Sequence, residues 1–333
     1  MKILITAPYN ENSRKTVAKA LGEVFYYPWK KNGKAYDEDE LMELLQQTGA
    51  EALITEHDHV TGKVIRTFPQ LRFIGVCRGT PSNVDVETAS VYHIPVFYTP
   101  ARNAQAVAEM FLANVINLMR NTLPAMEWLE NESWKAGAHD SYLQFKGNEL
   151  AGKTIGMVGF GAIGQRIAEM TQPFPCRIKY YDPYVNGTFD NAAPAALEEI
   201  FSQSDIVSIH LPANEQTQGM IDASLLKLMK KEAIFVNTSR AMVVKREELL
   251  KALLSKSIRG AVLDVFDAEP PDELDYTLIH LPQVLATPHI AGATHEVEDH
   301  HAEIMNRNLL NWFQHKEGKK SFVANLKDVV KAV

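Results

Sequence analysis

The sequence predicts an α/β protein with two doubly wound parallel-sheet domains. Short β-branched runs alternate with helical stretches twice, once from Lys2 to about Val96 and again from Thr154 to Ala286. This alternation is typical of parallel sheets with helical crossovers. The chain also has 333 residues. Because one hydrophobic core stops growing at roughly 250–300 residues, we expect two domains.

The first series of runs predicts a parallel sheet near the N-terminus. Apolar and β-branched residues predict its strands, at residues 3–6, 52–55 and 73–76. A helical period covers residues 39–47. Asn103 is a good N-cap for an apolar helical pattern that ends at Leu118, and we place a domain crossing there.

The second series begins after a segment without a clean period, residues 121–150, which we expect to form an irregular arm. Trp128 and Trp134 in this arm suggest a surface that another subunit covers. After the arm we predict a helix at 162–170 and strands at 154–158, 177–181, 206–209, 233–236, 258–263 and 284–286.

The last apolar pattern, from Val297 to Trp312, predicts one long helix that can carry the chain back to the first domain. The first domain would then be discontinuous. We therefore expect one domain of residues 1–102 plus 292–333 and another of residues 103–291.

Composition and charge exclude several classes of protein. The net charge is −7 with both signs interspersed, and the only basic cluster is Lys316, Lys319 and Lys320, so nucleic acid is not an expected partner. No apolar run approaches the roughly 20 residues of a membrane span, and the N-terminal run is too short for a signal peptide. Cys77 and Cys176 lie far apart, so no disulfide framework is expected, which fits a reducing cytoplasm.

The clearest motif is a glycine-rich turn between a predicted strand and a predicted helix. Gly159, Gly161 and Gly164 have the GxGxxG spacing of a dinucleotide-binding turn. One glycine makes the turn, one lets a pyrophosphate approach the backbone, and one permits close helix packing. Asp182 lies 18 residues after Gly164, near the spacing of the acid that hydrogen-bonds the ribose 2′-hydroxyl. These residues predict NAD, in preference to NADP, as the cofactor.

Two alternatives concern the glycines. Those of residues 159–164 also suit an ordinary strand-to-helix turn. Residues 147–154 match the phosphate-loop pattern GxxxxGK[ST] letter for letter. A true phosphate loop follows a strand and opens a helix, whereas this stretch leads into a predicted strand, so we interpret the match as chance.

Further polar residues follow three predicted strands. Thr238, Ser239 and Arg240 come after one strand, Asp264 after the next and His289 after the last. Open parallel sheets bind ligands at this carboxyl edge. A guanidinium and an imidazole beside a nucleotide site suit a reaction that polarises a carbonyl, moves a proton and moves a hydride. Taken singly, Arg240 also suits a structural ion pair and His289 a helix-flanking position.

No metal site is expected. His295, His300 and His301 lie near Glu296 and Glu298, but only part of this set has helical spacing and no metal-binding motif includes it.

These blocks together resemble the D-isomer-specific 2-hydroxyacid dehydrogenase family. The blocks are Gly159 to Gly164, Asn237 to Arg240, Leu263 to Pro270 and Thr287 to Gly292, and they occur in the family's order over almost the whole chain. The resemblance implies a Rossmann NAD-binding domain, a flavodoxin-like substrate domain and hydride transfer to or from a small D-2-hydroxy acid. The chain is most similar to the short, phosphoglycerate-dehydrogenase-like members without regulatory domains.

The resemblance also implies individual roles. His289 is the implied general acid/base, Glu269 orients it, and Arg240 binds the substrate carboxylate and polarises the reacting carbonyl. A carboxylate beside an imidazole stabilises the imidazolium, and a guanidinium matches a carboxylate in shape. His210 is expected in the pocket wall. The implied cofactor contacts are Ala162 and Ile163 at the pyrophosphate, Asp182 at the ribose, and Thr238, Ser239, Asp264 and Gly292 at the nicotinamide end.

The substrate loop departs from the family's pattern. Residues 76–85 occupy the position of the loop that binds the substrate carboxylate, and Arg78 and Gly79 are its candidate substrate residues. Many relatives are richer in glycine here. The cationic Arg78 therefore suggests a second anionic group, as on a phosphorylated or polyhydroxy acid. A salt bridge from Arg78 to a nearby helix that carries Asp85 explains the residue equally well.

A different class of function stays open. An NAD(H)-sensing, corepressor-like scaffold of the same fold can keep the catalytic residues, because fold alone does not fix function. The lack of long disordered tails disfavours it. A formate-dehydrogenase-like interpretation is weaker, since that branch pairs an amide with the histidine where this chain has Glu269. The arm and the family pattern favour a homodimer.

Overall fold

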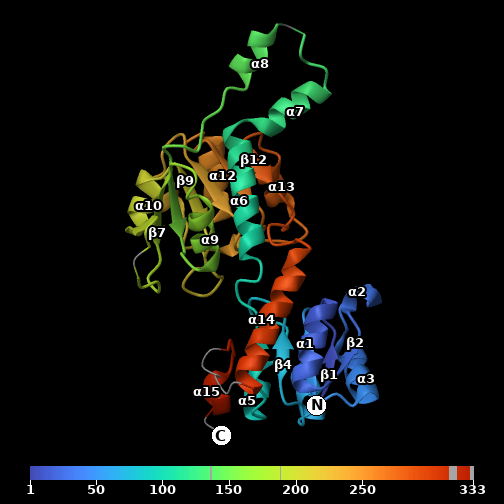
Figure 1. Ribbon diagram of the computed structural model, residues 1–333. Helices are drawn as coiled ribbons and strands as arrows, with labels where there is room; N and C mark the ends of the chain where they lie inside the picture. Colours follow the sequence, from blue (N-terminus) through green and yellow to red (C-terminus); the bar gives the residue numbers. More distant parts are fainter. Residues whose placement is uncertain (136, 188, 315–320, 331–333) are drawn as a thin grey trace. The chain divides into compact units, whose positions relative to one another are not determined.

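Two compact units make up the chain, Met1–Asn103 with Thr294–Val333 and Ala104–Ala293. The expected boundaries, 102/103 and 291/292, lie one and two residues before these. The computed structural model describes residues 1–135, 137–187, 189–314 and 321–330 (Figure 1). The basic cluster Lys316, Lys319 and Lys320 lies outside the described residues.

The first unit contains a five-stranded parallel sheet in the order β2-β1-β3-β4-β5. Its strands are β1 (Lys2–Ile5), β2 (Glu23–Tyr26), β3 (Ala52–Thr55), β4 (Ile74–Val76) and β5 (Val96–Tyr98). The predicted strands at 3–6, 52–55 and 73–76 are confirmed as β1, β3 and β4, with bounds that agree within one residue. β1 pairs with both β2 and β3. From β1 the chain first adds β2 on one side, and it then adds β3, β4 and β5 in order on the other side.

Helices cover both faces of this sheet. On one face α1 and α14 pack over β1 and β3, and on the other lie α3, α4 and α5. Their bounds are α1 (Glu11–Leu21), α3 (Glu38–Thr48), α4 (Gly62–Thr67), α5 (Val86–Val91) and α14 (Glu296–Phe313), and two short helices are α2 (Trp29–Asn32) and α15 (Leu326–Val330). α14 is the predicted long helix. Its buried Ala302, Met305 and Leu309 complete the core of this unit.

The second unit contains a seven-stranded parallel sheet in the order β12-β11-β10-β9-β6-β7-β8. Its strands are β6 (Thr154–Val158), β7 (Arg177–Tyr181), β8 (Ala192–Pro194), β9 (Ile206–Ile209), β10 (Ile234–Asn237), β11 (Gly260–Leu263) and β12 (Val284–Ala286). β6, β7, β9 and β12 have the predicted bounds, and β10 and β11 differ by one or two residues. The fold class predicted from the sequence is therefore confirmed.

Helices also flank the second sheet on both faces (Figure 1). One face carries α6 (Ala104–Met119) and α9 (Ala162–Met170). The other carries α10 (Leu197–Gln203), α11 (Ala223–Leu226), α12 (Arg246–Leu254) and α13 (Glu273–Ile279), and a 3-10 turn, η1, spans Ala241–Val243. None of the helices in the described part of the chain is long and apolar enough to cross a bilayer.

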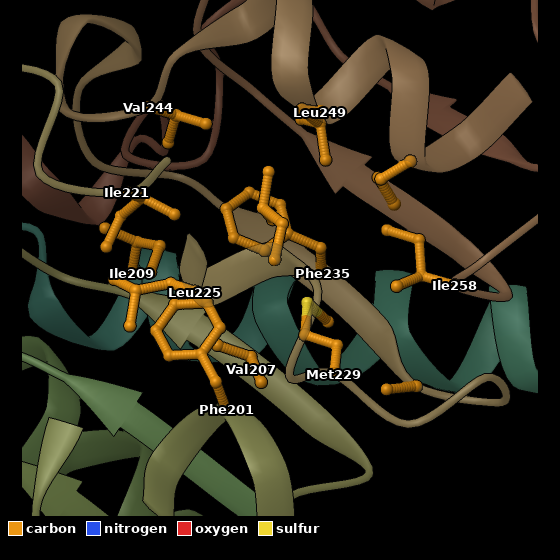
Figure 2. Packing of buried hydrophobic residues seen from close by; sticks show 14 of the residues in the cluster. Phe201, Val207, Ile209, Ile221, Leu225, Met229, Phe235, Val244, Leu249 and Ile258 are labelled. Carbon is orange, nitrogen blue, oxygen red and sulfur yellow. The ribbon is translucent and has the colours of Figure 1, made fainter. Parts of the chain in front are cut away.

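The core on the second of these faces is built around aromatic rings. Figure 2 shows Phe201 of α10 and Phe235 of β10 among the side chains of Val207, Ile209 and Leu249. Both rings are fully buried. Removing a buried phenylalanine ring costs about 3–5 kcal/mol. This packing fixes the strands whose ends carry the candidate site.

The arm at residues 121–150 was expected to be irregular, and that prediction was wrong. It contains two helices, α7 (Thr122–Glu130) and α8 (Ala138–Gln144). None of the α7 side chains is buried. Its apolar residues Leu123, Met126 and Leu129 do recur at helical spacing, but the stretch is too short for that period to stand out in the sequence. Trp128 packs against Trp134 and Phe145, with ring centroids 5.7 and 5.4 Å apart.

Candidate active site

The glycine-rich turn joins β6 to α9 at the carboxyl edge of the second sheet. Gly159 has φ +91°, and a Cβ there would lie 2.6 Å from the carbonyl oxygen of His210. A Cβ on Gly164 would lie 3.1 Å from the carbonyl oxygen of Gly159. A Cβ on Gly161 would meet nothing within 4 Å. Two glycines therefore permit close packing, and the third leaves open space where a phosphate can approach the start of α9.

The first turn of α9 adds Ala162 and Ile163, which are exposed and half-buried respectively. Asp182, just after β7, accepts hydrogen bonds from the backbone N–H of Phe160 at 2.8 Å and of Tyr184 at 2.9 Å. The acid thus holds the glycine turn in place. Because each carboxylate oxygen accepts about two hydrogen bonds, both oxygens keep capacity for a ribose hydroxyl.

The segment after β10 is a tight turn organised by Asn237. Its side-chain oxygen accepts from the backbone N–H and hydroxyl of Ser239 at 3.0 and 2.9 Å, and its amide donates to the carbonyl of Arg240 at 3.0 Å. Ser239 is thereby engaged within the turn. The Thr238 hydroxyl is buried and has no hydrogen-bond partner among the described residues. Arg240 is exposed, and its Nη1 donates to the Ser239 carbonyl at 2.6 Å.

The segment after β12 is held by Asp264, which follows the neighbouring strand β11. Asp264 is 1% exposed. Its carboxylate accepts from the Thr287 hydroxyl at 2.6 Å and from the backbone N–H groups of Ile290 and Ala291 at 2.9 and 2.8 Å. Between these anchors His289 has φ 54°, which is uncommon for a residue with a side chain. Gly292 follows directly.

His289 and Glu269 form the central pair of the site. Nδ1 of His289 lies 2.8 and 2.9 Å from the two carboxylate oxygens of Glu269. Their side chains are 47% and 45% exposed, so the pair is open to a ligand. The structure therefore brings together two residues that are 20 positions apart in the sequence.

Arg246, at the start of α12, fixes the segment that carries Glu269. Its guanidinium lies 3.1 Å from Asp267, 2.8 Å from Asp272 and 3.1 Å from Asp275. Burial raises the pKa of Asp267, and the Arg246 charge opposes that shift. Asp267 precedes Glu269 in the sequence, and Asp272 and Asp275 follow it, so Arg246 holds the chain on both sides of Glu269. Arg246 was not identified from the sequence, because its three aspartate partners become its neighbours only in the fold.

His210, after β9, is a buried histidine. Its Nε2 lies 2.9 Å from the Ser208 hydroxyl, and its buried Nδ1 has no partner among the described residues. Burial lowers the pKa of His210 to about 4. A ring with this pKa is uncharged at neutral pH, as suits the expected place in a pocket wall.

The phosphate-loop match at residues 147–154 has the wrong context. Thr154 begins strand β6, so the pattern opens a strand and not a helix. Gly147 approaches the carbonyl oxygen of Met119 so closely that a Cβ would lie 2.4 Å from it. Its glycines have packing and turn roles, in agreement with chance similarity.

The remaining candidates, Arg78 and Gly79, belong to the first unit and follow β4. Arg78 is half-buried and Gly79 is exposed. Glu56, His57 and Asp58 follow the nearby strand β3 and were not identified from the sequence. Three adjacent polar residues directly after a buried strand were the signal that could have found them.

The fold and this edge of the sheet define a dinucleotide-binding α/β protein with a histidine–glutamate pair at the same edge of the sheet as the nucleotide turn. The sequence profile described as "D-isomer specific 2-hydroxyacid dehydrogenase, NAD binding domain" matches residues 112–291. The chain belongs to the D-isomer-specific 2-hydroxyacid dehydrogenase family. It is an NAD-dependent oxidoreductase that acts on CH–OH groups.

Individual relatives agree with this assignment. YoaD of Bacillus subtilis, which carries a provisional 2-hydroxyacid dehydrogenase name, is 57% identical over 94% of this chain and 91% of its own length. The glyoxylate reductase of Thermococcus litoralis is 35% identical over 93% of this chain and 92% of its own. The crystal structure of the TT0316 protein from Thermus thermophilus has a TM-score of 0.79 at 28% identity, covering 96% of this chain and 99% of that one.

Proposed function

We propose that the protein interconverts a small D-2-hydroxy acid and its 2-keto acid, with His289 as general acid/base. The observation that carries the proposal is the contact between Nδ1 of His289 and both oxygens of Glu269. Because Nδ1 is engaged, Nε2 is the atom left to exchange a proton with the substrate oxygen. Glu269 stabilises the imidazolium that exists when the hydroxy acid has given up its proton.

Arg240 completes the substrate site in this proposal. Its exposed guanidinium follows the neighbouring strand β10 and has donors left after the single bond to the Ser239 carbonyl. A planar fork of donors matches a carboxylate and polarises an adjacent carbonyl. The strand between β10 and β12 provides Asp264, which orders the segment around His289.

The residues of the second unit fit NAD. A Cβ on Gly161 would occupy the open space where a pyrophosphate can approach, and a Cβ on Gly159 or Gly164 would press against backbone oxygens and disturb the turn. When bound there, NAD supplies the hydride acceptor or donor. In this proposal Ala162 and Ile163 lie at the pyrophosphate and Asp182 accepts from the ribose hydroxyls. The buried, unpartnered hydroxyl of Thr238, together with Ser239, Asp264 and Gly292, serves the nicotinamide end.

For the substrate we propose a 2-keto acid with a further polar group, of the phosphorylated or polyhydroxy class. Arg78 and Gly79 follow β4, at the carboxyl edge of the sheet in the first unit, which we propose as the substrate domain. Relatives at 32–35% identity carry the names glyoxylate reductase, hydroxypyruvate reductase and D-3-phosphoglycerate dehydrogenase. The substrates in these names differ in the group that is attached to the reacting carbon, C2.

We further propose a cytoplasmic homodimer in which the arm lies at the interface. Leu123, Met126 and Leu129 of α7 are 48–54% exposed, and Tyr142 and Leu143 of α8 are 67% and 71% exposed. A monomer rarely exposes apolar side chains so densely unless they bind a partner. Cys77 and Cys176 are both free thiols, which suits a reducing compartment.

The test is NADH oxidation by the purified protein against glyoxylate, hydroxypyruvate, phosphohydroxypyruvate and sugar-derived keto acids. We expect turnover of at least one keto acid, and we expect His289→Ala to abolish it while NADH affinity, measured by fluorescence titration, is kept. If the wild type turns over no keto acid, or if His289→Ala turns over the same substrates equally well, the proposal fails. An NAD(H)-sensing scaffold would then be the better description.

A further inference from the structure

The segment that carries Glu269 has little hydrogen bonding of its own. Residues 264–272 join β11 to α13 and form neither helix nor strand. Within the described part of the chain, only one backbone N–H of residues 265–269 donates a hydrogen bond, that of Ala268 to Oδ2 of Asp275 at 3.4 Å. The Glu269 side chain is 45% exposed. Its carboxylate is therefore fixed by groups outside the segment.

Arg246 extends toward this segment from a rigid part of the same unit. Backbone hydrogen bonds anchor the residues before it, because Ile221 donates to the carbonyl of Val243 at 3.0 Å and Lys245 donates to the carbonyl of Ile221 at 2.9 Å. After it, Leu249 of α12 is buried in the core. The guanidinium therefore starts from a fixed base.

The guanidinium of Arg246 meets three carboxylates of the later segment. Its Nε lies 3.1 Å from Asp267. Its Nη1 lies 2.8 Å from Asp272 and 3.1 Å from Asp275. Asp275 is 2% exposed, so this cation balances a charge inside the protein. The other oxygen of Asp275 accepts from the Ala268 N–H, and Asp275 thus connects the guanidinium to the backbone of the segment.

The helix that Arg246 begins does not account for the residue. Arg246 is the first residue of α12, where the helix dipole disfavours a cation. Glu247 and Glu248 in the same turn already supply the negative charge that the dipole favours. Burial raises the pKa of Asp267, Arg246 lowers it and Asp275 raises it, so the aspartates would repel one another without the cation. The contacts with the aspartates are therefore what Arg246 provides.

These ion pairs join two connections of the sheet. Arg246 follows Arg240 in the connection between β10 and α12, and Glu269 lies in the connection after the neighbouring strand β11. We propose that Arg246 is a positioning residue that holds Glu269, and through it the ring of His289, in place relative to Arg240. This inference rests on the proposed function and adds to it a residue that touches neither substrate nor cofactor.

Two variants of Arg246 and one matched control test the proposal. Arg246→Gln removes the charge, and Arg246→Lys keeps the charge but lacks the planar fork that reaches several carboxylates. The control is Arg259→Gln, at the amino end of β11 and so at the opposite edge of the same sheet. Arg259 is also half-buried and donates to the carbonyl of Met119 at 3.0 Å, so its removal also costs stability.

The first readout is kcat/KM for the keto acid that the wild type reduces best. We expect Arg246→Gln to lower it roughly 10- to 100-fold, because a misplaced catalytic group is costly. Arg246→Lys should lose less, Arg259→Gln should be nearly normal, and all three should keep their affinity for NADH. An unchanged kcat/KM in Arg246→Gln, or an equal loss in Arg259→Gln, would overturn the positioning role.

A double-mutant cycle with Glu269→Gln separates positioning from a general loss of structure. If Arg246 acts through Glu269, then Arg246→Gln should cost little more in a protein that already carries Glu269→Gln. Independent effects would multiply, and that result would refute the proposal. If urea unfolding shows that Arg246→Gln does not fold, Arg246→Lys takes its place in the cycle.

Hydrogen exchange separates failure of this inference from failure of the proposed function, because it needs no substrate. Mass spectrometry follows amide exchange in peptides that cover residues 264–272, in the wild type, Arg246→Gln and Arg259→Gln. We expect exchange there to be roughly 3- to 10-fold faster in Arg246→Gln alone, the usual value of one hydrogen bond. Arg246 then holds this segment even when no keto acid is turned over. Unchanged exchange would overturn the inference whatever the kinetics show.

Discussion

The carboxylate of Asp264 accepts a hydrogen bond from the backbone N–H of Ile290 at 2.9 Å, directly beside His289. Two further donors, the Thr287 hydroxyl and the Ala291 backbone N–H, reach the same buried carboxylate. His289 is therefore presented by a turn whose hydrogen bonds converge on one side chain of the neighbouring strand. This arrangement explains how a residue with φ 54° is kept in one conformation.

Asp264→Asn should loosen this turn. The amide replaces one accepting oxygen by a donor that faces a backbone N–H, so we expect a loss of about 1–3 kcal/mol in the free energy of unfolding. We also expect kcat for keto-acid reduction to fall roughly 10- to 100-fold, because a misplaced proton donor is costly. Urea unfolding and steady-state kinetics measure the two effects.

Thr287→Val is the control for Asp264→Asn, since it removes only one donor from the same carboxylate and should have a smaller effect. A variant Asp264→Asn with normal stability and normal kcat would contradict the anchoring role. A fall in NADH affinity with unchanged kcat would show that Asp264 acts on the cofactor alone.

Glu269→Gln should lower kcat/KM for keto-acid reduction. Both carboxylate oxygens of Glu269 lie within 2.9 Å of Nδ1 of His289, and a neutral amide holds the ring less firmly and interacts less favourably with an imidazolium. We expect a fall of roughly 10- to 100-fold while the affinity for NADH is kept. Steady-state kinetics and a fluorescence titration with NADH are the measurements, and an unchanged kcat/KM would remove Glu269 from the mechanism.

Asp182→Ala should weaken NAD binding and relax discrimination against NADP. The carboxylate repels a 2′-phosphate, and its removal abolishes that repulsion. It also releases the N–H groups of Phe160 and Tyr184, so the affinity for both cofactors should fall. The ratio of kcat/KM values for NADH and NADPH tests discrimination, and an unaltered ratio would mean that another residue reads the ribose.

His210→Gln should make the protein less sensitive to acid. Burial lowers the pKa of His210 to about 4 in the folded state, whereas an unfolded histidine titrates near 6.5. Below about pH 6.5 the unfolded state binds a proton that the folded state does not. The free energy of unfolding therefore decreases as the pH is lowered, by about 2 kcal/mol at about pH 5. Urea unfolding at neutral pH and at this acid pH should show a loss that is smaller by this amount in His210→Gln. Equal losses in the two proteins would mean that His210 does not contribute.

Much of the fold could be predicted because buried parallel strands leave a continuous apolar run. β6 and β9 are buried along their whole length, and β7 alternates the buried Ile178 and Tyr180 with more exposed residues. The bounds of all three strands were predicted correctly. β2, β5 and β8 were missed. All three are short strands at the edge of a sheet, and each includes residues that are partly exposed. α7 was missed because it has only nine residues, so the spacing of Leu123, Met126 and Leu129 covers too short a window to predict a helix.

Some residues of the candidate site could be predicted from the sequence, and others could not. Glycines, an arginine and a histidine at strand ends are visible in sequence because parallel strands end at one edge. Arg246, which meets three aspartates of a later segment, and His57, whose environment comes from Trp29 and two arginines, were not visible. Their surroundings depend on which elements become neighbours, and this is decided by the tertiary fold.

The discontinuity of the first unit has a consequence for the order of folding on the ribosome. The face of β1 and β3 that packs on α14 needs Ala302, Met305 and Leu309, and the buried Tyr9 hydroxyl bonds to Asn306 at 2.7 Å. Asn306 is synthesised 297 residues after Tyr9. The second unit, by contrast, is one uninterrupted stretch. Because domains fold as units during synthesis, the nucleotide-binding unit can fold first. The sheet of the first unit, although it is synthesised earlier, stays partly uncovered until α14 has been made.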